Sequence, residues 1–317
     1  GMTAYKASLI RSQRIQKTQI NEDSNDNLKY LDNKVTTFDS LYFEYFKFKK
    51  SKYIKYDKYR YKKYIQNRFG SKQPESISFE ELRDFKNEIS IGLKPATIKH
   101  VLELLRRLSN FGVKYQMTNG LSFPIEMPSL NNQKTETLTE EEFKILLSSM
   151  DQDSDQNIAK IMKMALFTGM RKGEIFNLKW TDINFNNRLI TIRNPKSGRD
   201  EHIPMNQSTY DLLKSHPTHD LNTELVFPNK FGKKRVDIRK GVDRIKKRAG
   251  LPKDFRGMHG LRHVFASRLA SSGKVDLYRI QKLLTHKSPQ MTQRYAHLHN
   301  EVLREASEIM DDIVNTY

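Results

Sequence analysis

The chain has 317 residues and a formal net charge of +19, from 56 Lys and Arg against 37 Asp and Glu. This length is typical of two domains, and the positive surplus favours a polyanionic partner over a basic protein with no nucleic-acid role. The absence of cysteine excludes disulfides and cysteine-ligated zinc. No apolar run approaches the roughly 18 residues of a membrane span, and the first residues lack the apolar core of a secretory signal. We therefore expect a cytoplasmic protein that contacts no membrane.

The first part of the chain changes from a polar segment to a lysine- and aromatic-rich region. Residues 1–33 cannot bury much apolar surface and have the composition of a flexible segment or linker. Residues 34–122 are basic and aromatic, and four of them recur at the i, i+3, i+4 and i+7 spacing of a helix: Tyr42, Tyr45, Phe46 and Lys49. This spacing predicts the first helix of a small all-helical domain.

Two further helices are predicted in the same domain. One spans residues 78–90, where Ser78 and Glu81 form the S-x-x-E pattern of a capping box. The other spans residues 95–111, with proline in its first turn and Gly112 at its end.

Residues 123–137 contain two prolines and a polar run, which predicts a linker between the domains. A second domain is then expected over residues 138–317. Its first helix opens with another capping box, formed by Thr139 and Glu142.

The second domain is predicted to be helical with one small antiparallel sheet. Helical pattern runs over residues 158–167, and a further helix starts near Arg171. Residues 189–193 are rich in β-formers, residues 194–198 have turn composition, and an extended segment returns at residues 202–205. The expected fold class is mainly α, with an α+β second domain.

Polar residues suited to chemistry gather in the second domain at five places: Arg171, Lys196, the run His259-Gly260-Leu261-Arg262-His263, His286 and Tyr295. Each has an ordinary structural explanation. Arg171 and Glu174 could form a surface ion pair, Lys196 a solvated turn residue, and Tyr295 part of a core. The three histidines could suggest a metal site, but no carboxylate accompanies them and Arg262 would bring a like charge to the cation.

Together these residue types share one chemical use, the transfer of a phosphoryl group without a metal. Arginine forks hold phosphate oxygens in two-pronged contacts and stabilise the charge of a pentacoordinate transition state. Histidine moves protons near neutral pH. Lysine can protonate a leaving alkoxide, and tyrosine supplies an oxygen nucleophile.

The order and spacing of these residues resemble the tyrosine recombinase (phage integrase) family, whose signature runs Arg, Lys, His-x-x-Arg, His or Trp, and Tyr. The likeness covers about residues 135–300 and lies in Thr168-Gly169-Met170-Arg171, Lys196, His259-x-x-Arg262-His263, Leu283-Leu284-x-His286 and Thr292-x-x-Tyr295-x-His297. Gly260 stands where the family commonly has Asp, and Thr285 where it commonly has Gly. Neither departure removes a reacting group.

The resemblance implies a covalent mechanism. Arg171, Arg262 and His286 bind the scissile phosphate of DNA. Tyr295 attacks this phosphate and forms a 3′-phosphotyrosine, which releases a 5′-hydroxyl.

The resemblance also implies roles in proton transfer and orientation. Lys196 acts as the general acid at the leaving oxygen, and His259 assists proton transfer at the nucleophile. Glu174 orients Arg171 or the His259 region, and His263 is a supporting residue. No cofactor and no metal ion is implied.

The same resemblance implies a helical, SAM-like core-binding domain over residues 34–122 and a catalytic domain over 138–317. The expected function is site-specific recombination or integration on double-stranded DNA, at the nucleoid. The apolar residues of 301–314 recur at helical spacing. They either pack on their own domain or dock on a neighbouring subunit in a homotetramer. An accessory directionality factor is a further possible partner.

Three alternatives stay open at this point. A type IB topoisomerase uses the same chemistry but relaxes DNA without exchanging partners. A catalytically silent DNA-binding protein could be built on the same fold. A metal-dependent nuclease could use the histidines.

Overall fold

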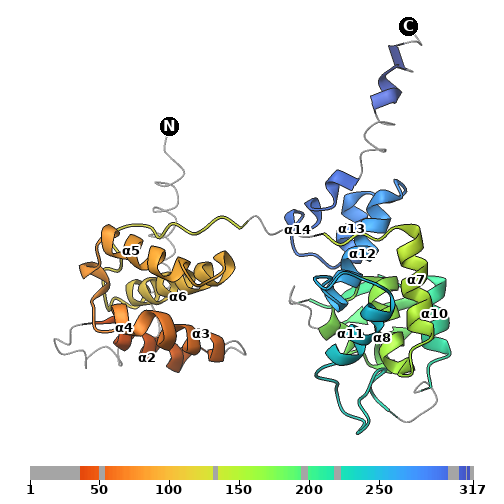
Figure 1. Ribbon diagram of the computed structural model, residues 1–317, viewed down its shortest axis with the longest axis horizontal. Helices are drawn as coiled ribbons and strands as arrows, with labels where there is room; N and C mark the ends of the chain where they lie inside the picture. The colour runs from red at the N-terminus through yellow and green to blue at the C-terminus, as the bar shows by residue number, and fades with distance from the viewer. Residues whose placement is uncertain are drawn as a thin grey trace, which may run out of the picture. The chain divides into compact units, whose positions relative to one another are not determined.

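A computed structural model describes residues 36–49, 54–130, 135–193, 199–217, 223–298, 307–311 and 313–314. The chain divides into two compact units, residues 1–131 and residues 132–317 (Figure 1). No helix in the described ranges is long and apolar enough to cross a membrane. The mainly helical fold with a small antiparallel sheet, which the sequence predicts, is confirmed.

The first unit is all-helical in its described part. Its elements are α2 (Phe38–Phe48), α3 (Ile54–Arg60), the π-helical turn Tyr61–Ile65, α4 (Gln66–Phe69), the 3-10 turn Pro74–Ser76, α5 (Phe79–Ser90) and α6 (Pro95–Lys114). Their apolar faces share one core, and α6 alone buries Ile98, Val101, Leu102, Leu104, Leu105 and Leu108. Burial of each such side chain stabilises the fold by about 1.5–3 kcal/mol.

The predicted start of α5 is confirmed, but its capping box is only half formed. The Ser78 hydroxyl accepts a hydrogen bond from the Glu81 N–H at 3.1 Å. The Glu81 carboxylate instead pairs with Lys72. A lysine partner therefore replaces the backbone N–H that the pattern predicted.

The prediction that α6 ends at Gly112 is wrong, since the helix continues to Lys114. Gly112 is buried inside the helix. A Cβ there would lie 2.3 Å from Thr118 Cγ2 and 2.8 Å from Leu41 Cδ2. The glycine allows α2 and the 115–120 turn to approach the helix closely, which is a packing role rather than a capping one.

The second unit contains most of the helices and the sheet. Its helices are α7 (Glu140–Asp151), α8 (Gln156–Thr168), α9 (Lys172–Ile175), α10 (Gln207–Lys214), α11 (Arg239–Arg248), α12 (Met258–Ser271), α13 (Leu277–Leu283) and α14 (Gln290–Gln293), with 3-10 turns at Trp180–Asp182 and Ala296–Leu298. The predicted capping box of α7 is complete. The Thr139 N–H donates to the Glu142 carboxylate at 2.8 Å, and the Glu142 N–H donates to the Thr139 hydroxyl at 3.1 Å.

The sheet has three antiparallel strands in the order β1 (Ile183–Asn184), β2 (Leu189–Ile192) and β3 (Glu201–Pro204). The register pairs Ile190 with Ile203. Ile190 and Ile192 point into the core, while the alternate residues are half-exposed, as the two-residue period of a strand requires. Strand β1 has only two residues, too few to show a period in the sequence.

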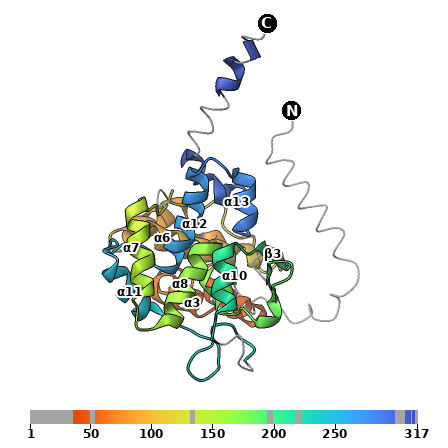
Figure 2. The same cartoon turned by 90° about the vertical axis from the view of Figure 1, so that its right-hand side faces the viewer.

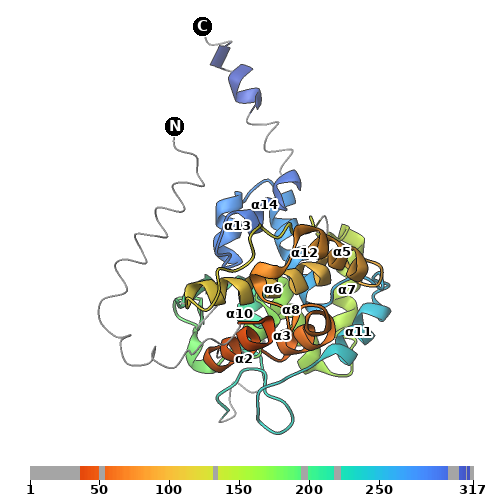
Figure 3. The same ribbon diagram turned by 90° about the vertical axis from the view of Figure 1, so that its left-hand side faces the viewer.

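Helix α8 is the centre of the second unit. Eight of its 13 residues are buried, and it contacts α7, α10, α11 and α12. The helix ends at Gly169, whose φ of +67° is the left-handed conformation that glycine adopts without strain. Helix α13 lies beside α12 at one end of this unit (Figure 2), and α14 lies next to α13 (Figure 3).

The expected linker, residues 123–137, has ordered ends. Ile125 is buried in the core of the first unit. Glu136 is buried in the second unit, where its carboxylate pairs with Arg256. Residues 131–134 lie outside the described ranges.

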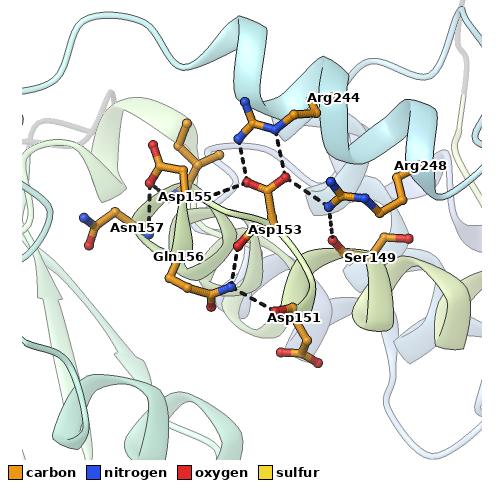
Figure 4. Close-up of polar contacts among 9 residues, drawn as sticks. Ser149, Asp151, Asp153, Asp155, Gln156, Asn157, Arg244 and Arg248 are labelled. Carbon is orange, nitrogen blue, oxygen red and sulfur yellow. Dashed lines mark hydrogen bonds and ion pairs between the residues drawn. The ribbon is translucent and has the colours of Figure 1, made fainter.

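Helix α11 is fixed to the α7–α8 turn by one buried carboxylate, that of Asp153 (Figure 4). Arg244 donates to it from Nε at 2.9 Å and from Nη2 at 2.5 Å, and Arg248 donates from Nη1 at 3.1 Å. Arg248 also donates to the Ser149 carbonyl, while the Asp155 N–H donates to Asp153 at 3.0 Å. These bonds to the charged form hold the pKa of Asp153 well below its usual range.

Candidate active site

Arg171 lies at the N-terminal end of α9, directly after the Gly169 turn. Its Nη1 donates to Glu174 Oε1 at 2.8 Å and to the Thr285 hydroxyl at 2.9 Å. The backbone N–H of Arg171 donates to the other Glu174 oxygen at 2.8 Å. Arg171 and Glu174 thus do form the i, i+3 pair, but it is a partly buried one that aims the guanidinium at the α13–α14 turn.

Arg262 is 4% exposed and crosses from α12 to the same turn. It donates from Nη1 to the Gly169 carbonyl at 2.5 Å and from Nη2 to the Leu284 carbonyl. Burial, followed by the nearby charge of Arg171, lowers the pKa of Arg262 to about 10. The side chain still carries its charge at neutral pH, so two positive charges are held close together and an anion between them would be stabilised.

Thr285 occupies a strained position. Its φ of +48° lies in the left-handed region, which β-branched residues rarely adopt and which costs about 1–3 kcal/mol. This explains why the related family commonly places glycine here. In this chain the threonine hydroxyl accepts a hydrogen bond from Arg171, a contact that glycine could not make.

Gly260 also departs from the family pattern, and the structure accounts for it. Gly260 is buried in α12, and a Cβ there would lie 2.7 Å from the Phe255 ring. Phe255 is itself 5% exposed. The aromatic ring therefore fills the space that an aspartate side chain would enter.

His286 follows Thr285 and is half-buried. Its Nδ1 lies 2.8 Å from the Thr292 hydroxyl, which fixes the orientation of the ring. Burial, together with the charges of Arg262 and Arg171, lowers the pKa of His286 to about 3. The ring is neutral at physiological pH and lies within the field of both arginines.

Tyr295 is 1% exposed, and its hydroxyl oxygen lies 2.6 Å from Nδ1 of His263. His263 is 3% exposed, and its Nε2 lies 3.2 Å from Nε2 of His259. Burial raises the pKa of Tyr295 to about 12 and lowers that of His263 to about 3. In this state the tyrosine is protonated and contacts His263. His259 in turn contacts the far side of the His263 ring.

The sequence interpretation missed three charged residues around this group. Glu136 is 5% exposed and pairs with Arg256, and both act electrostatically on His263 and Tyr295. Arg294, the residue before the tyrosine, lowers the pKa of Tyr295, and its buried Nε has no hydrogen-bond partner among the described residues. Adjacency to Tyr295 was the signal that could have indicated Arg294.

The structure brings together seven of the eight predicted site residues. Arg171, held by Glu174, and Arg262 contact the α13–α14 turn, which contains His286. Tyr295, His263 and His259 form a contiguous row. Lys196 lies in residues 194–198, outside the described residues. The two arginines form a positively charged site that could bind an anion. Beside it lies a protonated tyrosine, and the neighbouring histidine rings are neutral.

This combination of fold and residues defines a protein that can hold an anion beside a tyrosine hydroxyl. The family described as "Phage integrase family" matches residues 136–301, a little more than half of the chain. The chain belongs to this family and is a tyrosine-type site-specific recombinase.

Named relatives agree with this assignment. Tyrosine recombinase XerA of Pyrococcus furiosus is 32% identical over 62% of this chain and 68% of its own length. Tyrosine recombinase XerH of Campylobacter jejuni is 32% identical over 56% of this chain, and the match spans 52% of that protein. Each match therefore covers part of this chain and part of the relative.

Solved structures support the fold. The Tn1549 transposon integrase in complex with transposon right end DNA has a TM-score of 0.73, covers 87% of this chain and all of its own, and is 20% identical. The XerH recombinase bound to a palindromic difH substrate has a TM-score of 0.63 at 26% identity, and covers 80% of this chain and 77% of its own.

Proposed function

We propose that this chain cuts and rejoins double-stranded DNA through a covalent bond to Tyr295. The observation that carries the proposal is the pair Arg171 and Arg262, held on carbonyl and carboxylate partners within one electrostatic neighbourhood that also contains His286 and Tyr295. Glu174 offsets this pair of charges only in part, so an anion held by both guanidinium groups would be stabilised. A phosphodiester supplies that anion.

In the proposed reaction Arg171, Arg262 and His286 hold the nonbridging oxygens of the scissile phosphate. The guanidinium forks stabilise the extra charge of the transition state. Glu174 and Thr285 orient Arg171. Tyr295 forms the 3′-phosphotyrosine bond as the 5′ oxygen leaves, and the phosphodiester energy is conserved in that bond.

Proton transfer completes the proposal. Lys196 protonates the leaving 5′ oxygen, and His259 assists removal of the proton from the nucleophile. Rejoining reverses these steps when the 5′-hydroxyl of a partner duplex attacks the linkage. No cofactor enters the scheme.

The first unit is proposed to grip the duplex as a core-binding domain. Its α3 presents two exposed tyrosines, Tyr59 at 56% and Tyr56 at 51%, and the following π turn adds exposed lysines. Lys63 donates to the Tyr59 hydroxyl at 2.9 Å and lies over its ring. Lysines of this kind contact phosphates and make affinity fall steeply with salt.

We further propose that four protomers assemble on DNA, at the nucleoid, and that the C-terminal helical segment links them. Residues 307–311 are helical, and Ile309, Met310, Ile313 and Val314 are between 47% and 63% exposed. Packing of this segment on its own domain would have buried these side chains. We also propose that an accessory factor acts on this assembly and sets the direction of recombination.

The test is a trapping experiment in EDTA with nicked duplexes of randomised sequence. A nick lets the short 5′-hydroxyl strand diffuse away, so covalent adducts accumulate and survive SDS. We expect adducts with the wild-type protein and none with Tyr295→Phe, and sequencing of the adducts would identify the target site.

Normal DNA binding without adducts would contradict the proposal and favour a silent binding protein. The recombinase relatives disfavour the topoisomerase alternative. Relaxation of any supercoiled plasmid without sequence preference would restore it.

A further inference from the structure

The hydroxyl of Tyr295 contacts a histidine to which the proposed reaction gives no chemical step. Its oxygen lies 2.6 Å from His263 Nδ1, a direct hydrogen-bond distance. His259, the residue proposed to assist at the nucleophile, reaches Tyr295 in this structure only through His263, at 3.2 Å between the two Nε2 atoms. The contacts therefore form a row of three groups rather than a pair.

The row is built into one helix. His259 and His263 are four residues apart on α12 (Met258–Ser271), so they lie on the same helix face. Their rings meet edge to face, with centroids 4.6 Å apart and an interplanar angle of 88°. This geometry brings one ring nitrogen of each histidine to the other and leaves the second nitrogen of each ring for a different partner.

The outer end of the row reaches solvent. His259 is exposed, whereas His263 is 3% exposed. His259 lines an open cavity of about 360 Å³, large enough for several water molecules. The walls carry both signs of charge, from Lys172, Arg256 and Asp237 among others. A proton delivered to His259 can therefore pass to water without crossing the protein core.

We propose that His263 is the catalytic base that takes the proton of Tyr295, and that His259 relays a proton from His263 to water in this cavity. This inference rests on the proposed function, because it assigns a step of the same reaction. It makes the assistance of His259 indirect and adds a catalytic residue at the reacting atom.

The step balances as follows. The Oη–H bond of Tyr295 breaks and an N–H bond forms at His263 Nδ1, while His263 passes its Nε2 proton to His259 Nε2. His259 loses its Nδ1 proton to water. The lone pair freed on the phenolic oxygen forms the bond to phosphorus, and the bond from phosphorus to the 5′ oxygen breaks. Lys196 protonates that oxygen.

Charges around the row keep it inactive without DNA. Burial, and then the charges of His259 and Arg256, hold the pKa of His263 at about 3, against about 12 for Tyr295. Arg262 and Arg294 face Tyr295, and Glu136 opposes them in part. Proton transfer from Tyr295 to His263 is therefore strongly uphill in the free protein.

The decisive variant is His263→Asn, which keeps an acceptor oxygen near the position of Nδ1 but cannot bind a proton. We expect covalent adduct on nicked duplex to form about 100-fold more slowly, at saturating DNA, with DNA affinity unchanged. A fluorinated, more acidic tyrosine placed only at position 295 should recover much of this loss. His216→Gln is the matched control, since His216 is 2% exposed and lies outside the site, and it should react like wild type.

Retention of the wild-type rate by His263→Asn, or a deficit that the fluorinated tyrosine leaves unchanged, would overturn the relay and leave the proposed function standing. A wild-type protein that forms no Tyr295-dependent adduct would overturn both. If His263→Asn fails to fold, the variant His259→Ala tests the relay in its place, and its adduct should also form more slowly than that of the wild type. Imidazole added to the buffer should enter the cavity and restore its rate, and failure to do so would count against the relay.

Discussion

Arg294 illustrates how one charge, in addition to burial, acts on several titratable groups of this site. It precedes the nucleophile, and it lowers the pKa of Tyr295 as well as the pKa values of His259, His263 and His286. Its Nε is buried without a hydrogen-bond partner in the described part of the chain. Such an arrangement is costly in the free protein and becomes favourable when an anion enters the site.

We therefore predict that Arg294→Gln raises the pKa of Tyr295 and of the three site histidines. Removal of a positive charge makes the phenolate harder to form and the imidazolium easier to form. NMR titration of labelled histidine and tyrosine rings measures both effects. Arg279→Gln is the control, because the Arg279 side chain is 72% exposed on α13. Unchanged titration curves in Arg294→Gln would show that its charge does not reach the site.

The sequence was sufficient to propose the reacting residues but not to predict their contacts. Arg171, Arg262, His286 and Tyr295 carry chemistry in their residue types and order. The contact between Tyr295 and His263 joins residues 32 positions apart and depends on how the segment after α14 packs on α12. The burial of Glu136 beside Arg256 spans 120 positions. Neither leaves a local pattern, so neither could be predicted.

At the level of elements, Asp153 holds α11 against α7 and α8. Its side chain is fully buried, whereas those of Arg244 and Arg248 are 43% and 35% exposed. We predict that Asp153→Asn lowers the free energy of unfolding by about 1–3 kcal/mol at pH 7, since charged hydrogen bonds are lost and the arginines stay in place. Urea unfolding measures the change, with the exposed Asp151→Asn as the control.

The pH dependence of this effect has a definite sign. The pKa of Asp153 is lowered in the folded protein. Its contribution is therefore complete above the unfolded pKa of about 3.9 and is lost as the pH falls through the lower folded value. The difference between wild type and Asp153→Asn should narrow from pH 7 to pH 3. A constant difference would mean that the carboxylate charge is not what anchors α11.

Local signals predicted elements well and packing poorly. The cap of α7, the glycine that ends α8 and the strands β2 and β3 follow from residues close in sequence. The role of Gly112 was predicted wrongly, because the sequence alone does not distinguish a glycine needed for close packing inside a helix from a glycine that ends the helix. The Asp153 contacts join residues 91 and 95 positions apart, so no helical period reveals them.

At the scale of the whole molecule, the exposed apolar residues near the C-terminal end carry the last prediction. Ile309 and Ile313 are four residues apart, and each is about half-exposed, at 57% and 47%. Residues one helical turn apart form a stripe, and an uncovered apolar stripe gains stability when a partner surface buries it. A second copy of the chain fits the proposed assembly, in which each protomer would both give and receive such a segment.

The double variant Ile309→Asp with Ile313→Asp should keep the wild-type melting temperature, because exposed positions contribute little to stability. It should also keep the rate of adduct formation on a single half-site. Sedimentation with paired target duplexes should show loss of the four-protomer complex. Ile145→Asp places a charge on a similarly exposed position of α7, 42% exposed, and should leave assembly intact. If the double variant still assembles four protomers, the stripe has another partner and the contacts between protomers must lie elsewhere on the two units.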